Sequence, residues 1–549
     1  MRPRRSRCRA GCFLIAVLLA TAPGGARTER LTLRPVVLDL PGPPALVIPT
    51  DLDRDGRLDL VVVVAFTEIQ EIGGDRIEDL VQVTTVIPAL FDRREVRFYR
   101  GEPDGGYTLA APPFRLPRSV LNLEPGPEGM DLVALTDQGL SALLLEPGGT
   151  RLRLKPVLED PPVLAHTGAF YPSLRLVRDL DGDGDADLLI PTDGGLAVYV
   201  WSPSGLRPAG RPPLPGSTPG RRWYPIPRVG HVNGDAFPDL VFEKGLDPST
   251  GEGPSVLLGR GDGSFEPVRG QPVDCHDDGS QLRIAGFPPM VDARPRDVVT
   301  LRDLDGDRRA ELVRSRERDR GDGLRATLKE ARRPVQDYRF HDLTPDLAVE
   351  TDPYFGMVVT GHTVDADLTA EGLPFRIASF QDLDGDGRQD LVSVTLDFSV
   401  FQALKILATR KVGIGLDFHV YCQTADRRFR EVTGLDLAEK LRLDLDNLKL
   451  GRFAQFAGDF DGDGRQDFVH LGRGRRITIH RGGPGCRFPR HPDLAVELEE
   501  EPPSLDLVYI GDLDGDGRAD LRITRPLPAT SEDVSAPVRM ELHLSGAGS

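Results

Sequence analysis

DLDGDGRQDL, residues 382–391, is the stretch of sequence that decides the fold of this chain. Its acids stand at the first, third, fifth and ninth positions, and a glycine, Gly387, stands at the sixth. Oxygen ligands at alternate positions suit a hard divalent cation, because a chain that turns tightly around Ca²⁺ presents every second side chain to the ion. The glycine permits the sharp bend. An apolar run, residues 391–396, follows, so the stretch predicts a calcium loop that leads into a β-strand.

The same loop recurs along the chain, and each copy is named below by its first residue. Four further copies keep all the acids and the glycine. The Asp303 loop has Arg308 in place of the glycine, which predicts a strained bend and a guanidinium that competes with the cation. The weaker His231 loop has lost the first acid, and we expect no metal there. The expected ligands of the five complete loops are Asp51, Asp53, Asp55 and Asp59; Asp179, Asp181, Asp183 and Asp187; Asp382, Asp384, Asp386 and Asp390; Asp459, Asp461, Asp463 and Asp467; and Asp512, Asp514, Asp516 and Asp520. Those of the Asp303 loop, whose occupancy the sequence leaves open, are Asp303, Asp305, Asp307 and Glu311.

Three other interpretations of these loops were weighed against Ca²⁺. An EF-hand needs an acid at the twelfth position, where the Asp382 loop has Ser393 and the Asp51 loop has Val62. Mg²⁺ rarely uses an all-protein cage. Turns with solvated carboxylates suit Asp and Gly, but four carboxylates in one tight turn repel one another without a cation. We therefore expect Ca²⁺ in five or six loops, where it ties together the two strands that flank each loop.

The spacing of the loops predicts a repeat protein. Their starts, together with a unit near residues 123–132 that lacks the acids, lie about 50–80 residues apart. Residues 224–270 show the unit compactly as four short strand-like runs, with the acidic loop between the first two. Four antiparallel strands per repeat are typical of a β-propeller blade. The chain is therefore expected to be all-β, a closed propeller of eight blades, with seven as the alternative.

The two ends of the chain predict how the ring closes. The last unit lacks a fourth strand, and the strand-like residues 30–40 precede the first unit, so we expect residues 30–40 to pair with residues 538–544. Residues 27–549 are expected to form one domain. Its units are residues 41–116, 117–160, 170–215, 222–270, 296–343, 373–434, 450–500 and 504–545 with 30–40, and its inserts are residues 66–93, 271–296, 343–373 and 398–415.

The N-terminus and the composition indicate an exported protein. Residues 1–26 combine a basic start, the short apolar run 12–22 and small residues, which predicts a cleaved secretory signal peptide, with an uncleaved anchor as the alternative. No later segment is apolar enough to span a membrane. The net charge of −17 argues against nucleic-acid binding. Cleavage leaves Cys275, Cys422 and Cys486, which allow one disulfide, and the sequence does not say which.

The repeated motif Asp-x-Asp-x-Asp-Gly-x-x-Asp-Leu, followed by an apolar strand and a glycine-rich turn such as LLGRGDGSF (residues 257–265), resembles the FG-GAP or VCBS repeat family. These are the propeller repeats of the integrin α-subunit head and of many secreted bacterial proteins. The resemblance covers nearly all of the chain after the signal. It implies Ca²⁺ in loops on one face of the ring, with the inserts 66–93 and 398–415 on the opposite face.

The sequence contains no recognisable catalytic signature. The ten histidines form no zinc pair and no Ser/His/Asp arrangement. We therefore expect a secreted, periplasmic or cell-surface protein that acts as a non-catalytic binding or adhesion scaffold for a protein or carbohydrate ligand. The alternative is a polysaccharide-degrading enzyme, a lyase or hydrolase, built on a propeller.

Overall fold

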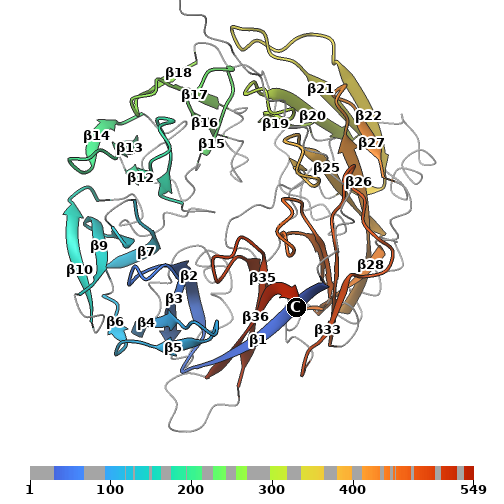
Figure 1. Ribbon diagram of the computed structural model, residues 1–549. Coiled ribbons are helices and arrows are strands. Elements are labelled where there is room, and N and C mark those ends of the chain that lie inside the picture. The colour runs from blue at the N-terminus through green and yellow to red at the C-terminus, as the bar shows by residue number, and fades with distance from the viewer. Residues whose placement is uncertain are drawn as a thin grey trace, which may run out of the picture.

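The computed structural model is a ring of β-sheets. Within the part of the chain that it describes, every regular element is a strand, and the strands form eight sheets around a central axis (Figure 1). The predicted eight-bladed β-propeller is confirmed, and the alternative of seven blades is wrong. The described residues are 30–66, 93–117, 119–127, 130–146, 151–161, 175–192, 195–212, 227–242, 255–268, 297–317, 335–363, 380–397, 411–432, 438–444, 449–451, 453–471, 475–500, 508–527 and 537–548.

Blades 1 to 4 follow one another in chain order. Blade 1 consists of β2 (Pro44–Thr50), β3 (Asp59–Phe66), β4 (Arg93–Gly101), β5 (Tyr107–Leu109) and β6 (Phe114–Arg115). Blade 2 consists of β7 (Val120–Pro125), β8 (Leu132–Thr136), β9 (Gly139–Leu145) and β10 (Leu152–Leu158). Blade 3 consists of β11 (Val177–Arg178), β12 (Asp187–Thr192), β13 (Gly195–Val200) and β14 (Arg207–Gly210). Blade 4 consists of β15 (Arg228–Gly230), β16 (Asp239–Phe242), β17 (Ser255–Gly259) and β18 (Phe265–Pro267).

Blades 5 to 8 complete the ring. Blade 5 consists of β19 (Asp297–Arg302), β20 (Glu311–Glu317), β21 (Val335–His341) and β22 (Phe355–Thr360). Blade 6 consists of β23 (His362–Thr363), β24 (Phe380–Gln381), β25 (Asp390–Asp397), β26 (Lys411–Gln423), β27 (Phe429–Glu431), β28 (Ala438–Asp444) and β29 (Lys449–Gly451). Blade 7 consists of β30 (Phe453–Phe456), β31 (Phe468–Leu471), β32 (Arg476–His480) and β33 (Leu494–Glu497). Blade 8 consists of β34 (Val508–Gly511), β35 (Asp520–Pro526), β36 (Val538–Gly548) and β1 (Arg30–Leu40).

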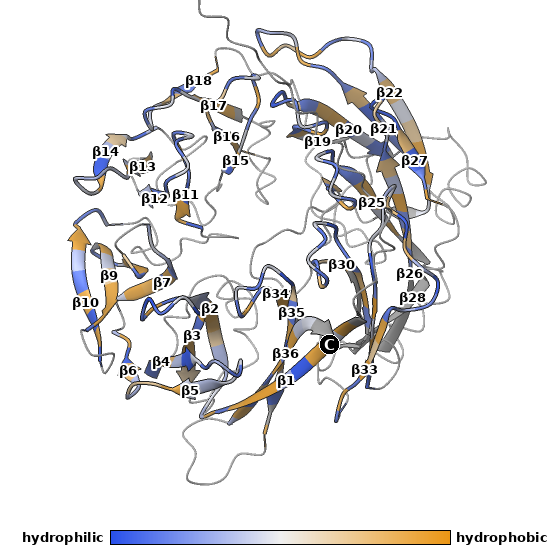
Figure 2. Cartoon of the chain, in the orientation of Figure 1, coloured by the Kyte–Doolittle hydropathy of each residue, from blue (hydrophilic) through white to orange (hydrophobic). Residues whose placement is uncertain are grey.

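The hydrophobic core lies between the blades. In blades 1 to 4 every residue of the second strand is buried, because the sheet is covered on both faces. The cluster between blades 8 and 1 joins Leu542 of β36 to Leu60 of β3, and the cluster between blades 6 and 7 joins Val420 to Phe456. Figure 2 shows hydrophobic residues along the strands and hydrophilic residues in the loops that connect them. A blade is therefore stabilised mainly by its two neighbours.

The N-terminal strand closes the ring as predicted. β1 pairs antiparallel with β36 over its full length, from Arg30 opposite Gly548 to Leu40 opposite Val538. Blade 8 has the order β1-β36-β35-β34, so the first strand of the chain is the outer strand of the last blade. In Figure 1 the blue β1 lies against the red β36. Pairing between the two ends of the chain leaves no blade incomplete.

The structure differs from the expected inserts at two places. Residues 355–360, within the insert expected over 343–373, form β22 and pair with β21 as the outer strand of blade 5. Residues 411–415, within the insert expected over 398–415, belong to β26, whose first half pairs with β28 and whose second half pairs with β27. In both cases the strand is assigned to its blade by the strand with which it pairs, which a local pattern does not reveal. The signal segment 1–26 and the inserts 67–92, 271–296 and 398–410 lie outside the described residues.

Among the described residues, no helix has the length and apolarity that crossing a bilayer requires.

Candidate calcium-binding loops

The acidic loops of neighbouring blades are bonded to one another through their backbones. Each loop joins the innermost strand of its blade to the second strand, so the loops share one face of the ring. From blade 5 to blade 8 each loop donates an amide hydrogen to a carbonyl of the loop before it. The bonds run from Ala310 N to Val232 O (3.0 Å), Gln389 N to Leu304 O (2.7 Å), Gln466 N to Leu383 O (3.0 Å) and Ala519 N to Asp459 O (2.7 Å). The loops therefore form a continuous arc.

The ninth-position acid ties three strands of its blade together. Asp390 accepts a hydrogen bond from Leu383 N with Oδ2 (2.9 Å) and one from Gln423 N, at the end of the third strand, with Oδ1 (2.7 Å). The equivalent acids do the same in the other complete loops: Asp59 with Leu52 N and Gly101 N, Asp187 with Leu180 N and Trp201 N, Asp467 with Phe460 N and Gly482 N, and Asp520 with Leu513 N and Ser545 N. The strand at each loop's exit is thus fixed in register by the acid that begins it.

The first-position acid closes the turn. Asp382 accepts a hydrogen bond from Gly385 N with Oδ1 (2.8 Å) and one from Gly387 N with Oδ2 (2.8 Å). Gly387 has φ 86°, in the left-handed region that favours glycine. In the Asp303 loop Arg308 adopts φ 68° at the same position, so the strained bend predicted from the sequence is present there.

The third-position acid leaves an oxygen without a partner in three loops. Asp384 accepts Gly485 N with Oδ2 (2.7 Å), while its Oδ1 is buried and accepts no hydrogen bond. Asp53 accepts a hydrogen bond from Arg100 Nε with Oδ2 (2.6 Å), and the Oδ2 of Asp461 lies 3.3 Å from Arg481 Nε. The Oδ1 of Asp53 and that of Asp461 are also buried without a hydrogen-bond partner. A buried carboxylate oxygen with no partner is costly, and a bound cation would satisfy it. These residues fit Ca²⁺.

The structure brings the predicted ligands together in different combinations. Ligand oxygens within 4.8 Å of one another come from Asp51, Asp53 and Asp59; from Asp179, Asp181 and Asp187; and from Asp382, Asp384 and Asp386. An arginine at the seventh position pairs with the fifth-position acid, as Arg388 does with Asp386 and Arg57 with Asp55. This pairing was not predicted from the sequence, although the spacing of two residues between the acid and the arginine was visible.

Burial and repulsion by neighbouring carboxylates raise the pKa of the ninth-position acids. Burial, reinforced by Asp384 and Asp386, raises the pKa of Asp390 to about 7, although backbone hydrogen bonds oppose the shift. The same causes raise the pKa of Asp467 and Asp520 to about 7 and that of Asp187 to about 6. A divalent cation would take the place of these protons.

The Asp303 loop differs because a guanidinium already lies among its acids. Arg427, in the turn after β26 of the next blade, is 2.8 Å from Asp305 Oδ2, 2.8 Å from Glu311 Oε1 and 2.6 Å from Asp342 Oδ1. Its guanidinium stacks on the ring of Tyr354, 4.1 Å from the centroid. The sequence pointed to Arg308 as the competing cation, but the residue in contact with the acids is Arg427, which no local pattern could have indicated.

The His231 loop holds no comparable set of acids. His231 Nδ1 lies 3.1 Å from the carbonyl oxygen of Phe237, and Asn233 donates to Asp235 at 2.6 Å. Asp239 keeps the structural role of the ninth position through Val232 N and Gly259 N. This copy retains the fold of the loop through hydrogen bonds among its own residues.

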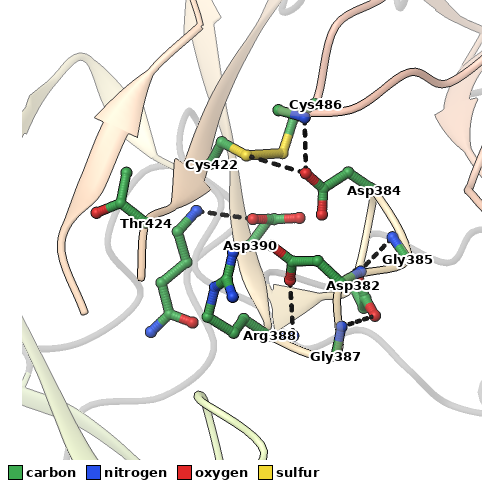
Figure 3. A network of polar contacts seen from close by, with 12 residues as sticks. Asp382, Asp384, Gly385, Gly387, Arg388, Asp390, Cys422, Thr424 and Cys486 are labelled. Atoms are coloured by element: carbon green, nitrogen blue, oxygen red, sulfur yellow. Dashed lines mark hydrogen bonds and ion pairs between the residues drawn. A yellow bond between two sulfur atoms is a disulfide. The ribbon is translucent and has the colours of Figure 1, made fainter. Parts of the chain in front are cut away.

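A disulfide lies against the Asp382 loop. Cys422 at the end of β26 is bonded to Cys486 of blade 7, with 5.7 Å between their Cα atoms. Figure 3 shows the two sulfur atoms above Asp384 and Asp390. This resolves the pairing that the sequence left open, and Cys275 lies outside the described residues.

Residues 179–242 match the family model of the FG-GAP-like repeat. The resemblance to FG-GAP repeats is confirmed. The matched segment runs from the acidic loop of blade 3 to the end of β16 in blade 4, so the sequence repeat is offset from the structural blade. No curated protein matches the chain. Among solved structures, a protein from Lactobacillus plantarum is similar at 8% sequence identity over 83% of this chain and 86% of that chain, with a TM-score of 0.24, which is too low to support an argument.

Proposed function

We propose that this chain is an exported β-propeller stabilised by Ca²⁺ in its five complete loops. The observation that carries the proposal is the buried, unpartnered oxygen on Asp53, Asp384 and Asp461, at the same position of three loops. In each loop the ion would be held by the first- and third-position carboxylates together with the ninth or the fifth. In four of the five loops the fifth-position acid also pairs with an arginine two residues later. Extracellular Ca²⁺ sites bind at roughly 10⁻⁴ to 10⁻³ M, which suits an exported protein.

Export is supported by two independent features. The disulfide between Cys422 and Cys486 belongs to proteins that mature in an oxidising compartment. The N-terminal residues carry the basic and apolar segments of a secretory signal.

The propeller acts, in this proposal, as a scaffold that binds a protein or glycan through the face opposite the loops. β3 begins at the loop face with Asp59 and ends on the opposite side with Phe66, and β25 runs likewise from Asp390 to Asp397. The sequence segments that follow Phe66 and Asp397 are the irregular ones, and irregular connections on a rigid scaffold are where binding residues concentrate. Loop acids that already bind backbone amides and Ca²⁺ are poorly suited to act as catalysts.

Two experiments test the proposal. Equilibrium dialysis should give about five Ca²⁺ per chain, and a chain that binds none would overturn the metal assignment. Protein and glycan arrays should show a ligand whose binding is lost when residues 67–92 are replaced by a short Gly/Ser linker, with D384N as the control that leaves this face intact. Release of product from a bound polysaccharide would instead identify an enzyme.

A further inference from the structure

The Asp382 loop is oriented by two backbone amides, and each amide lies next to one of the bonded cysteines. Gln423, whose N–H binds Asp390 Oδ1 at 2.7 Å, directly follows Cys422. Gly485, whose N–H binds Asp384 Oδ2 at 2.7 Å, directly precedes Cys486. The disulfide thus joins the two donors that set the third- and ninth-position carboxylates of a single loop (Figure 3).

The second donor comes from a neighbouring blade and a constrained turn. Gly483 and Arg487 exchange backbone hydrogen bonds of 2.9 and 3.2 Å, which places Gly485 and Cys486 at the tip of a tight turn of blade 7. Cys486 has φ 52°, an unfavourable conformation for a residue with a side chain. Its sulfur is fully buried, and the Cys422 sulfur lies 3.8 Å from Asp384 Oδ2. The Cys422–Cys486 disulfide links this turn covalently to blade 6.

The Asp382 loop differs from the other two loops with an unpartnered third-position oxygen in the charge of the group that contacts this acid. Asp53 and Asp461 are met by the guanidinium groups of Arg100 and Arg481. A guanidinium within 4 Å competes electrostatically with a divalent cation for the same carboxylate. Asp384 is instead met by a neutral amide, so the full charge of this carboxylate remains available to the ion.

We propose that the Cys422–Cys486 disulfide is a positioning device for the Asp382 loop, and that it makes this loop a tighter Ca²⁺ site than the Asp51 and Asp459 loops. The inference rests on the proposed calcium binding and deepens it. The two cysteines do not touch the ion; they act through Gly485 and Gln423 on Asp384 and Asp390. Without the bond the turn of blade 7 leaves Asp384, whose carboxylate then turns toward solvent.

The test compares Ca²⁺ titrations of the full chain and of the C422S/C486S variant by equilibrium dialysis. We expect one site to weaken by about tenfold or more, as is typical when residues that orient metal ligands are lost, while the other sites keep their affinity. In a D384N background, which removes the same site, C422S/C486S should change nothing further. Unchanged titrations would overturn the inference, and so would an equal loss at every site, since that indicates general loosening of the ring.

A second measurement covers the case in which the variant does not fold. The folded full chain is treated in Ca²⁺ with a water-soluble phosphine, which breaks the S–S bond; each sulfur takes a proton, and the phosphine becomes its oxide with oxygen from water. The same single site should weaken. A full chain that binds no Ca²⁺ before reduction overturns the proposed function itself, whereas one that binds it equally before and after reduction overturns only the role of the disulfide.

Discussion

The Asp382 loop of blade 6 and the Asp303 loop of blade 5 have nearly the same sequence, but they differ in whether an arginine neutralises their acids. DLDGDGRQDL and DLDGDRRAEL differ at the sixth, eighth and ninth positions. In the Asp382 loop, both carboxylate oxygens of Asp390 accept hydrogen bonds from backbone amides, and one buried oxygen of Asp384 has no partner. In the Asp303 loop, Arg427 lies among the acids and supplies the positive charge.

The extra methylene group of Glu311 contributes to this difference. Glu311 keeps the bond to Leu304 N with Oε2 (2.8 Å), but its longer side chain carries Oε1 to Arg427. Burial raises the pKa of Glu311, and the nearby guanidinium opposes the shift. The comparison teaches that the acidic motif alone does not define a metal site, because an arginine from the next blade can replace the ion.

Removal of Ca²⁺ should have the largest effect on the whole ring. Each occupied loop contributes about 1–3 kcal/mol when the ion is ten to a hundred times above its Kd, so five loops together lower the melting temperature strongly when a chelator is added. Calorimetry in Ca²⁺ and in chelator checks this. Coincident melting curves would contradict occupied loops.

Of the single substitutions in these two loops, replacement of Arg427 should lower the free energy of unfolding the most. R427A leaves Asp305 and the buried Glu311 uncompensated, and we expect a loss of about 3 kcal/mol in the free energy of unfolding. The matched control is R428A, from the same turn, whose exposed pair with Asp426 is 3.4 Å long and should contribute little to the free energy of unfolding. Equal losses for both variants would show that the contacts of Arg427 do not stabilise the loop.

Exchange of the third-position acid distinguishes the two loops directly. D384N should lower the melting temperature in Ca²⁺ by an amount corresponding to about 1–3 kcal/mol and have little effect in chelator, because its main loss is the ion. D305N should destabilise by the same amount in both conditions, because its partner is Arg427. Melting of both variants with and without Ca²⁺ checks this, and calcium-dependent destabilisation by D305N would reverse our assignment of the two loops.

The pH dependence should be the smallest effect. Because the pKa of Asp390, Asp467 and Asp520 is about 7 in the folded apo chain and near 4 when unfolded, these acids stabilise the apo chain below pH 4, and this contribution is lost as pH rises through 7. Ca²⁺ offsets the loss. The melting temperature gained with Ca²⁺ should therefore be greater at pH 8 than at pH 5.5. Dialysed apo protein avoids the pH dependence of chelators, and an equal gain at both pH values would contradict these shifts.

Much of the fold could be predicted because its signals are local and repeated. The acidic loops marked the first strand pair of seven blades, and the spare strand at residues 30–40 predicted the pairing with β36. The strand β22 was predicted only as an extra strand inside an insert, because its pairing with β21 is what makes it the outer strand of blade 5. The spacing of the acids predicted the closed turn at Asp382, but it could not reveal the amide of Gly485, which comes from 101 residues further along the chain.

The sequence by itself determined the repeat, most of the strands and the acidic loops of seven blades, because glycine, alternating carboxylates and apolar runs act within ten residues. Only the tertiary structure decided which cation each loop can accept. That choice depends on what the neighbouring blade presents to the third-position acid: a neutral amide beside a disulfide at Asp384, and a guanidinium at Asp305. Charges in a buried site act over a few ångströms in space, and ring closure brings together residues that are far apart in the chain.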